Sequence, residues 1–133
     1  MERINEMARI GWIPSNQTKG IEVYVHTDDN DNVPHFHVRK YGSHNDFEWE
    51  VCVRYDSAQY FSHGRYGGIM PTKITKMLDK MLREKDPKSR HDETYWEEAI
   101  DEWNRNNSDI EIDKKLEQPD YSQLNYNDND FVG

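Results

Sequence analysis

Two histidines stand one residue apart in the segment VPHFHV, residues 33–38, and a third, His26, precedes this segment. Side chains two residues apart on a β-strand point to the same face, so His35 and His37 share one side of any strand that contains them. Imidazole nitrogens bind zinc and other transition metals, and three of them with a carboxylate make a plausible metal site. His26, His35 and His37 are therefore the candidate metal ligands, with zinc or another divalent transition metal as the ion. The alternative is a solvent-exposed sheet face on which histidines are ordinary polar residues or form a pH-sensitive contact surface.

The strands that position these histidines are indicated by alternating apolar and polar residues. Such alternation runs through 21–27, 34–41 and, most strongly, 46–55. If the first two form a hairpin with Thr27 opposite Pro34, three pairs of side chains face each other on the polar side. These pairs are His26 with His35, Tyr24 with His37, and Glu22 with Arg39. The opposite charges of the last pair support this register.

The third strand brings further polar side chains to the same face. Glu48, Glu50 and Cys52 alternate with its apolar residues, so they can join the histidine cluster. Tyr24, Arg39 and Glu50 are the candidates for a contact surface at this place. The catalytic residues of any enzyme stay unknown, because the sequence contains no nucleophile elbow, phosphate-binding loop or dinucleotide fingerprint.

The rest of the chain predicts the elements around this sheet. Residues 58–64 indicate a fourth strand, and ARIGWI, residues 8–13, a short one before the first loop. The apolar residues change to a helical period in 71–87 and again in 91–107. Asp92 fits the N-cap of the second helix. We expect an α+β fold, in which a small antiparallel sheet of about three to four strands has one face covered by two amphipathic α-helices.

The length of 133 residues fits a single domain. We place this α+β domain in residues 1–107. An acidic, Asn/Asp-rich C-terminal tail follows in 108–133, and it is expected to be partly ordered. Ile110 and Ile112 indicate a short strand within that tail.

The net charge of −9 argues against general binding to nucleic acid or to an anionic membrane. A basic helix face within 73–90 is a local exception, and the oligomeric state stays open. Cys52 is the single cysteine, so no intramolecular disulfide can form, which suits a cytoplasmic protein. No stretch of the sequence is apolar enough for a signal peptide or a membrane helix.

Three stretches carry a family resemblance: IEVYVHTDDNDNVPHFHVRKYG, GGIMPTKITKMLDKML and WEEAIDEW, which together span roughly residues 21 to 104. In these stretches the chain resembles the small bacterial family catalogued as domain-of-unknown-function family 4160, and the Pro-His-Phe-His-Val core is the specific part. The resemblance implies a single domain of this fold, with functional positions at His35, His37 and Tyr24 and no established activity. Members are often encoded near small partner genes of toxin–antitoxin type, which implies a regulatory or defence-related role.

Three functions are therefore open. The first is a small cytoplasmic binding or regulatory module that acts by protein–protein contact on the polar sheet face. The second is a metal-dependent hydrolase or nuclease that uses His26, His35 and His37 with Glu50. The third is an acidic inhibitor, encoded by a mobile element, that imitates nucleic acid. The negative net charge is the observation that suggests this function.

Overall fold

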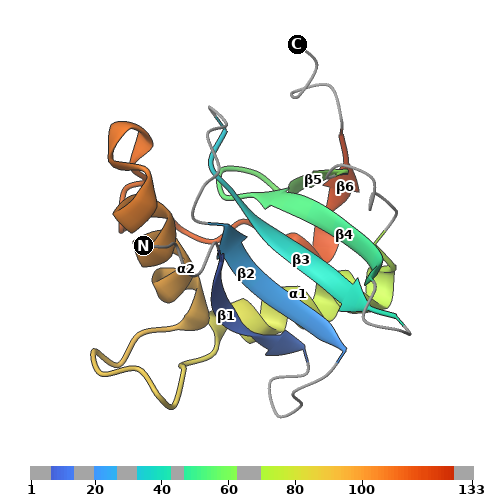
Figure 1. Ribbon diagram of the computed structural model, residues 1–133, viewed down its shortest axis with the longest axis horizontal. Helices are drawn as coiled ribbons and strands as arrows, with labels where there is room; N and C mark the ends of the chain where they lie inside the picture. The colour runs from blue at the N-terminus through green and yellow to red at the C-terminus, as the bar shows by residue number, and fades with distance from the viewer. Residues whose placement is uncertain (1–6, 14–19, 27–32, 43–46, 63–69, 128–133) are drawn as a thin grey trace, which may run out of the picture.

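The computed structural model describes residues 7–13, 20–26, 33–42, 47–62 and 70–127. Within these ranges the fold is α+β, with a six-stranded mixed sheet in the order β1-β2-β3-β4-β5-β6 and two α-helices (Figure 1). The elements are β1 (Met7–Ile13), β2 (Ile21–His26), β3 (His35–Tyr41), β4 (Phe47–Arg54), β5 (Gln59–Ser62), α1 (Thr72–Arg83), α2 (Tyr95–Asn106) and β6 (Asn125–Tyr126). The predicted α+β class is confirmed. The sheet has more strands than expected because β1 and β6 form its two edges, and it is mixed instead of antiparallel because β5 and β6 pair parallel.

β2 and β3 pair antiparallel in the register that the sequence predicts. Tyr24 lies opposite His37, and Glu22 lies opposite Arg39. β4 continues the sheet, with Cys52 opposite His37. Because side chains alternate between the two sides of a strand, all of these project from one side of the sheet. We call this side the polar face.

An irregularity in β1 changes which of its side chains reach the polar face. The register between β1 and β2 shifts between Arg9 and Gly11. Arg9 therefore lies opposite Tyr24, whereas Trp12 lies opposite Glu22. A bulge of this kind places an odd and an even position on the same side of the sheet.

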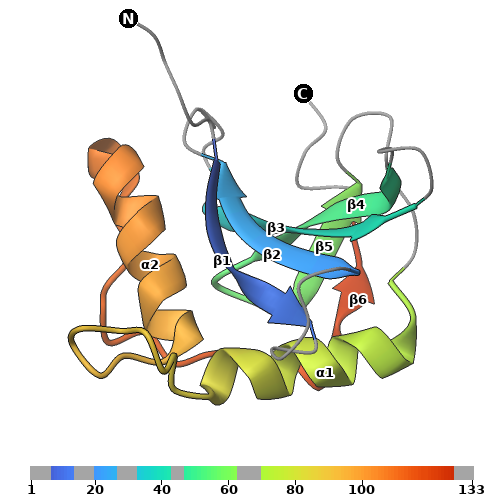
Figure 2. The ribbon, with the colours of Figure 1, turned by 60° about the horizontal axis from the view of Figure 1, so that its bottom comes forward.

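The other side of the sheet holds the apolar core. Its fully buried strand residues are Val23, Val25, Phe36, Val38, Val51 and Val53. α1 lies across this side, and α2 stands beside the sheet in contact with β1, β2 and β3 (Figure 2). A Cβ atom at Gly11 would lie 2.6 Å from Met81 Cε and 3.2 Å from the ring of Tyr95, so a larger residue here would force the flexible end of the Met81 side chain to move.

α2 begins at a different N-cap from the one predicted. The Thr94 hydroxyl accepts a hydrogen bond from the Glu97 N–H at 3.1 Å, and the Glu97 carboxylate accepts one from the Thr94 N–H at 2.9 Å. This reciprocal pair satisfies two backbone donors at the helix start. Asp92 lies outside the helix with φ 57°, and Lys85 Nζ donates to its carboxylate. The prediction of Asp92 as the N-cap is therefore wrong.

The segment after α2 begins with a turn instead of the predicted strand through Ile110 and Ile112. Ser108–Ile110 forms a short 3-10 helix. The indole Nε1 of Trp103 donates to the Ile110 carbonyl at 2.9 Å, and the Asn104 amide donates to the Ile112 carbonyl at 2.9 Å. These carbonyls are bound to α2 side chains, which explains why this segment does not pair with the sheet.

The chain then returns to the sheet. Tyr121 is fully buried, and its hydroxyl donates to the Arg54 carbonyl at 2.5 Å. β6 follows and pairs parallel with β5. Residues 128–133, the end of the predicted tail, lie outside the described ranges. Neither helix of the described ranges is both long and apolar enough to cross a membrane.

Candidate metal centre on the polar face

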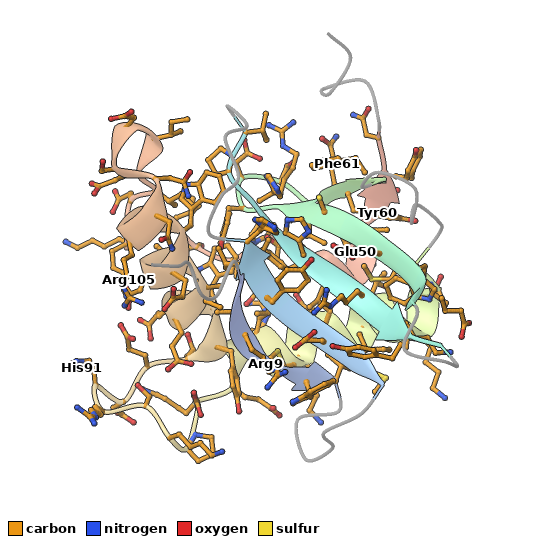
Figure 3. The ribbon with its side chains drawn as sticks, viewed as in Figure 1. Arg9, Glu50, Tyr60, Phe61, His91 and Arg105 are labelled. Atoms are coloured by element: carbon orange, nitrogen blue, oxygen red, sulfur yellow. The ribbon has the colours of Figure 1, made fainter. Side chains whose placement is uncertain are left out.

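The central part of the polar face is buried, which corrects the expectation of a solvent-exposed sheet surface. The exposed fraction is 0% for Glu22, His35, His37 and Cys52, and 3% for Tyr24 and Glu50. These side chains come from β2, β3 and β4, and Glu50 is labelled among them in Figure 3. A buried polar group is costly unless it is hydrogen-bonded or bound to an ion, so the partners of these groups decide what the face can do.

Two histidines and the cysteine form a compact group on this face. One ligand atom from each of His35, His37 and Cys52 can be chosen so that all lie within 4.8 Å of one another. The Cys52 Sγ lies 3.8 Å from His37 Nδ1. Among the described residues, no other set of three or more histidine, cysteine, aspartate or glutamate side chains meets as a candidate metal site. The alternation of β3 and the facing position in β4 bring the three together.

The spacing of this group is close to what one metal ion requires. Zn–N bonds near 2.0–2.1 Å and Zn–S bonds near 2.3 Å place the ligand atoms of a tetrahedral site about 3.3–3.6 Å apart. A group that spans up to 4.8 Å therefore has to contract by about 1 Å, which small side-chain rotations can supply. Imidazole and thiolate donors together suit zinc and other late transition metals.

Glu50 connects His37 to Tyr24. The Tyr24 hydroxyl donates to Glu50 Oε2 at 2.5 Å, and His37 Nδ1 lies 3.0 Å from the same oxygen. The rings of Tyr24 and His37 are stacked, with their centroids 4.8 Å apart. Burial, and then the hydrogen bond to Glu50, raises the pKa of Tyr24 well above its ordinary value. Tyr24 therefore keeps its proton and acts as a hydrogen-bond donor.

His35 is held by the backbone and by aromatic rings. Its Nδ1 lies 2.8 Å from the Val33 carbonyl oxygen. Its ring packs 5.6 Å from the ring of Phe61, which comes from β5, and 5.6 Å from that of Trp103, which comes from α2. These rings belong to three separate parts of the chain, so the position of His35 depends on the assembled fold.

The remaining predicted ligand, His26, lies beside the group at the end of β2. Its ring centroid is 5.9 Å from that of His37, and its side chain is partly exposed. It is not among the three residues whose ligand atoms meet within 4.8 Å. The structure thus brings His35, His37 and Cys52 together and places His26 at their margin.

A second polar cluster occupies the β1 side of the polar face. Glu22 accepts hydrogen bonds from Arg9 Nε at 2.5 Å, Arg39 Nε at 2.8 Å and the Tyr41 hydroxyl at 2.9 Å. The Arg9 guanidinium lies 4.8 Å from the centre of the Trp12 ring, and the Arg9 side chain is 48% exposed. We call these five residues the arginine–aromatic cluster. The sequence predicted the Glu22–Arg39 pair, but nothing in it signals the bulge that adds Arg9 and Trp12.

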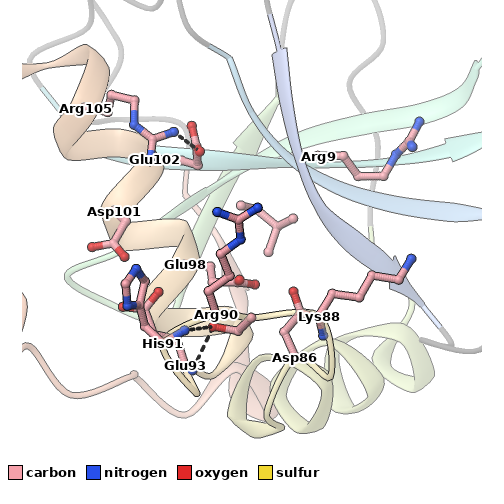
Figure 4. Close-up of a pocket in the computed structure, with 12 residues that line it drawn as sticks. Arg9, Asp86, Lys88, Arg90, His91, Glu93, Glu98, Asp101, Glu102 and Arg105 are labelled. Carbon is pink, nitrogen blue, oxygen red and sulfur yellow. Dashed lines mark hydrogen bonds and ion pairs between the residues drawn. The ribbon is translucent and has the colours of Figure 1, made fainter.

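A cavity of about 340 Å³ lies on the other side of β1, between that strand, α2 and the segment before it (Figure 4). Its lining carries basic residues (Arg9, Lys88, Arg90, Arg105) and acidic ones (Asp86, Glu93, Glu98, Asp101, Glu102). Burial, and then a hydrogen bond with Asp86, raises the pKa of Glu98 to about 8. None of the three residues of the candidate metal centre lines this cavity.

The basic stretch 73–90 is divided between two places. Lys73, Lys76 and Lys80 are exposed on α1. Arg83 is bound to Asp79 at 3.1 Å, one helical turn before it. Lys88 and Arg90 belong to the mixed-charge cavity. The stretch therefore does not form one continuous positive surface.

Comparison of the whole chain with known proteins found no match: no protein-family model, no curated protein and no solved structure matches the chain. The resemblance to family 4160 accordingly depends on the quoted sequence stretches alone, and the function has to be inferred from the residues and their geometry.

Proposed function

We propose that the protein is a small metal-binding module, with zinc as the first candidate ion, held by His35, His37 and Cys52. The observation that carries this proposal is the meeting of three ligand atoms within 4.8 Å at side chains that are 0% exposed. Two neutral imidazoles and one thiolate match the donors that zinc takes in proteins. A bound ion would also compensate the cost of burying these polar groups between strands.

The burial of all three side chains favours a structural centre over a catalytic one. Three ligands leave the fourth position of a tetrahedral ion open, but a hydrolase or nuclease also needs the substrate to reach the water bound there, and side chains that are 0% exposed shield this position. A structural ion instead joins elements that the fold has brought together, and here it would join β3 to β4. The proposed role is therefore to stabilise the sheet and, through it, the surfaces that the sheet presents.

Zinc binding can be tested by equilibrium dialysis followed by elemental analysis. The wild-type protein is expected to retain about one zinc per chain, and Cys52→Ser, which removes the thiolate, is expected to lose most of it. The matched control is His91→Ala, because His91 is exposed and distant from the group in sequence. If wild type and Cys52→Ser retain the same zinc, or neither retains any, the buried residues serve packing only and the proposal fails.

Protein–protein contact is a second candidate function, and the arginine–aromatic cluster is the observation that favours it. Glu22 and Trp12 hold the Arg9 side chain in place while leaving it 48% exposed. A fixed guanidinium beside an aromatic ring is typical of residues that dominate binding interfaces. Its charge suits a partner that presents carboxylates.

The contact proposal predicts that Arg9→Glu abolishes recovery of a specific partner in co-purification from the native cells. Lys73→Glu makes the same charge change at an exposed site on α1 and is expected to leave recovery unchanged. Equal recovery by wild type and Arg9→Glu would exclude this cluster as the contact site.

A further inference from the structure

We infer that the cavity between β1, α2 and the segment before α2 binds a small zwitterion, a molecule that carries both an ammonium group and a carboxylate (Figure 4). Its volume of about 340 Å³ lies within the range of about 300–1,000 Å³ that is usual for ligand pockets in proteins. The inference is independent of the proposed metal-binding function, because His35, His37 and Cys52 do not line this cavity.

The wall that the segment before α2 contributes is held in shape by its own hydrogen bonds. The Oγ of Ser89 accepts hydrogen bonds from the N–H groups of His91 at 3.3 Å and Glu93 at 3.0 Å (Figure 4). The Asp86 N–H donates to the Glu93 carbonyl at 3.0 Å and so closes the two ends of the segment on each other. The wall is therefore formed without a ligand, and binding does not incur the entropic cost of ordering it.

Most charged side chains of the lining already have a partner of opposite charge. These pairs are Arg105 with Glu102, Arg9 with Glu22, and Lys114 with both Glu93 and Asp101. Four charged residues of the lining are left, the acidic Asp86 and Glu98 and the basic Lys88 and Arg90. Within the described part of the chain, none of these four forms an ion pair with another side chain, so their charges are available to a ligand.

The two acidic residues form the part of the site that fits an ammonium group. The hydrogen bond between the side chains of Asp86 and Glu98, together with burial, is what raises the pKa of Glu98. Two carboxylates that meet repel each other when both are ionised, and a cation placed between them removes this repulsion. An ammonium group has three N–H donors, and ionised carboxylate oxygens only accept, so the two sides are complementary.

The two basic residues form the part that fits a carboxylate. Lys88 and Arg90 are both exposed on the segment before α2. The Arg90 side chain extends from this segment into the space between α2 and β1 (Figure 4). A guanidinium group can donate two parallel N–H hydrogen bonds to one carboxylate, and such charge-assisted pairs are stronger than neutral hydrogen bonds. Arg90 is therefore the expected partner of the ligand carboxylate.

Titration of the full-length chain with ω-amino acids from glycine to 6-aminohexanoate tests the inference, with amide ¹H–¹⁵N spectra as the readout. Alkylamines and alkylcarboxylates of the same lengths are the matched probes, because each carries only one of the two charges. At least one ω-amino acid is expected to shift the amide resonances of Ser89 and Glu98. We expect it to bind about tenfold more tightly than the amine or the carboxylate of its length.

Variants assign the two charges of the ligand to the two parts of the cavity. Arg90→Ala is expected to lower the affinity for that ω-amino acid about tenfold and to leave amine binding unchanged. Glu98→Gln is expected to weaken the binding of both the ω-amino acid and the amine. Lys76→Ala removes an exposed charge on α1 outside the lining, and we expect it to bind as wild type does. Because Arg90 is exposed, its variant decides the question even if Glu98→Gln does not fold.

Three results would overturn the inference. The first is that no ω-amino acid shifts the resonances of the cavity. The second is an amine that binds as tightly as the ω-amino acid of its length, since the basic residues would then contribute nothing. The third is equal affinity of wild type and Arg90→Ala for the ω-amino acid.

Discussion

Zinc at about a thousandfold excess over its dissociation constant is expected to raise the free energy of unfolding of the wild-type protein by about 4 kcal/mol. The reason is that the ligands come from two strands and meet only in the folded chain. An ion that binds the folded state more tightly than the unfolded state shifts the equilibrium by mass action. Denaturant unfolding with and without zinc measures the difference, with a chelator to confirm that it is reversible.

The variants that remove a ligand make this prediction specific. Cys52→Ser and His37→Ala are each expected to lose most of the zinc-dependent stabilisation, whatever their stability without metal. His91→Ala keeps all three ligands, and we expect it to respond to zinc as wild type does. An equal zinc effect in all four proteins would show that zinc binds elsewhere on the chain.

Trp103→Ala is expected to lower the free energy of unfolding by about 3–5 kcal/mol, the usual cost of truncating a buried tryptophan. Trp103 is fully buried, and its ring lies 5.6 Å from that of His35 and 6.2 Å from that of Tyr55. Its Nε1 also donates to the Ile110 carbonyl. The substitution therefore removes contacts to the sheet and to the segment after α2 at once.

The control is Trp12→Ala, at a tryptophan that is only partly buried on the polar face. Its cost is expected to be clearly smaller, because less apolar surface returns to water. Urea unfolding of both variants supplies the comparison. A loss below about 1 kcal/mol for Trp103→Ala would mean that α2 contributes little to the core, contrary to its burial.

The sequence predicted the pairing of the central strands because two independent constraints coincide there. The alternation of residues sets which side chains share a face, and the charges of Glu22 and Arg39 select one register among those allowed. Two of the three predicted pairs, Glu22 with Arg39 and Tyr24 with His37, are present, and the paired part of β2 and β3 ends before His26 and His35. The α+β class followed from the change of period between the strands and the helices.

The burial of the polar face could not be predicted from that alternation. Alternating polar residues are typical of a sheet surface that faces water. The same pattern results when the polar residues are buried and form hydrogen bonds with one another. Here Tyr24, Glu50 and His37 are linked in a hydrogen-bonded chain, and Glu22 is bound by three donors. Whether such groups find partners depends on distances between strands, which one sequence does not contain.

Cys52 shows how far the candidate site could be predicted. Its place in the alternation puts Cys52 on the same face as the histidines. The same alternation also puts Glu48 and Glu50 there, so it does not single out the cysteine. Only the pairing of β3 with β4 places Cys52 directly opposite His37. The position of His26 at the margin of the group likewise depends on ring orientations that a register does not determine.

The absorption spectrum of the Co²⁺-substituted protein tests the central claim most directly, because a thiolate bound to cobalt gives an intense charge-transfer band that imidazoles alone do not. We predict that titrating metal-free wild type with Co²⁺ produces this band, that it saturates at about one ion per chain, and that Cys52→Ser lacks it. A wild-type spectrum without the band, or a band that persists in Cys52→Ser, would contradict a metal centre formed by His35, His37 and Cys52.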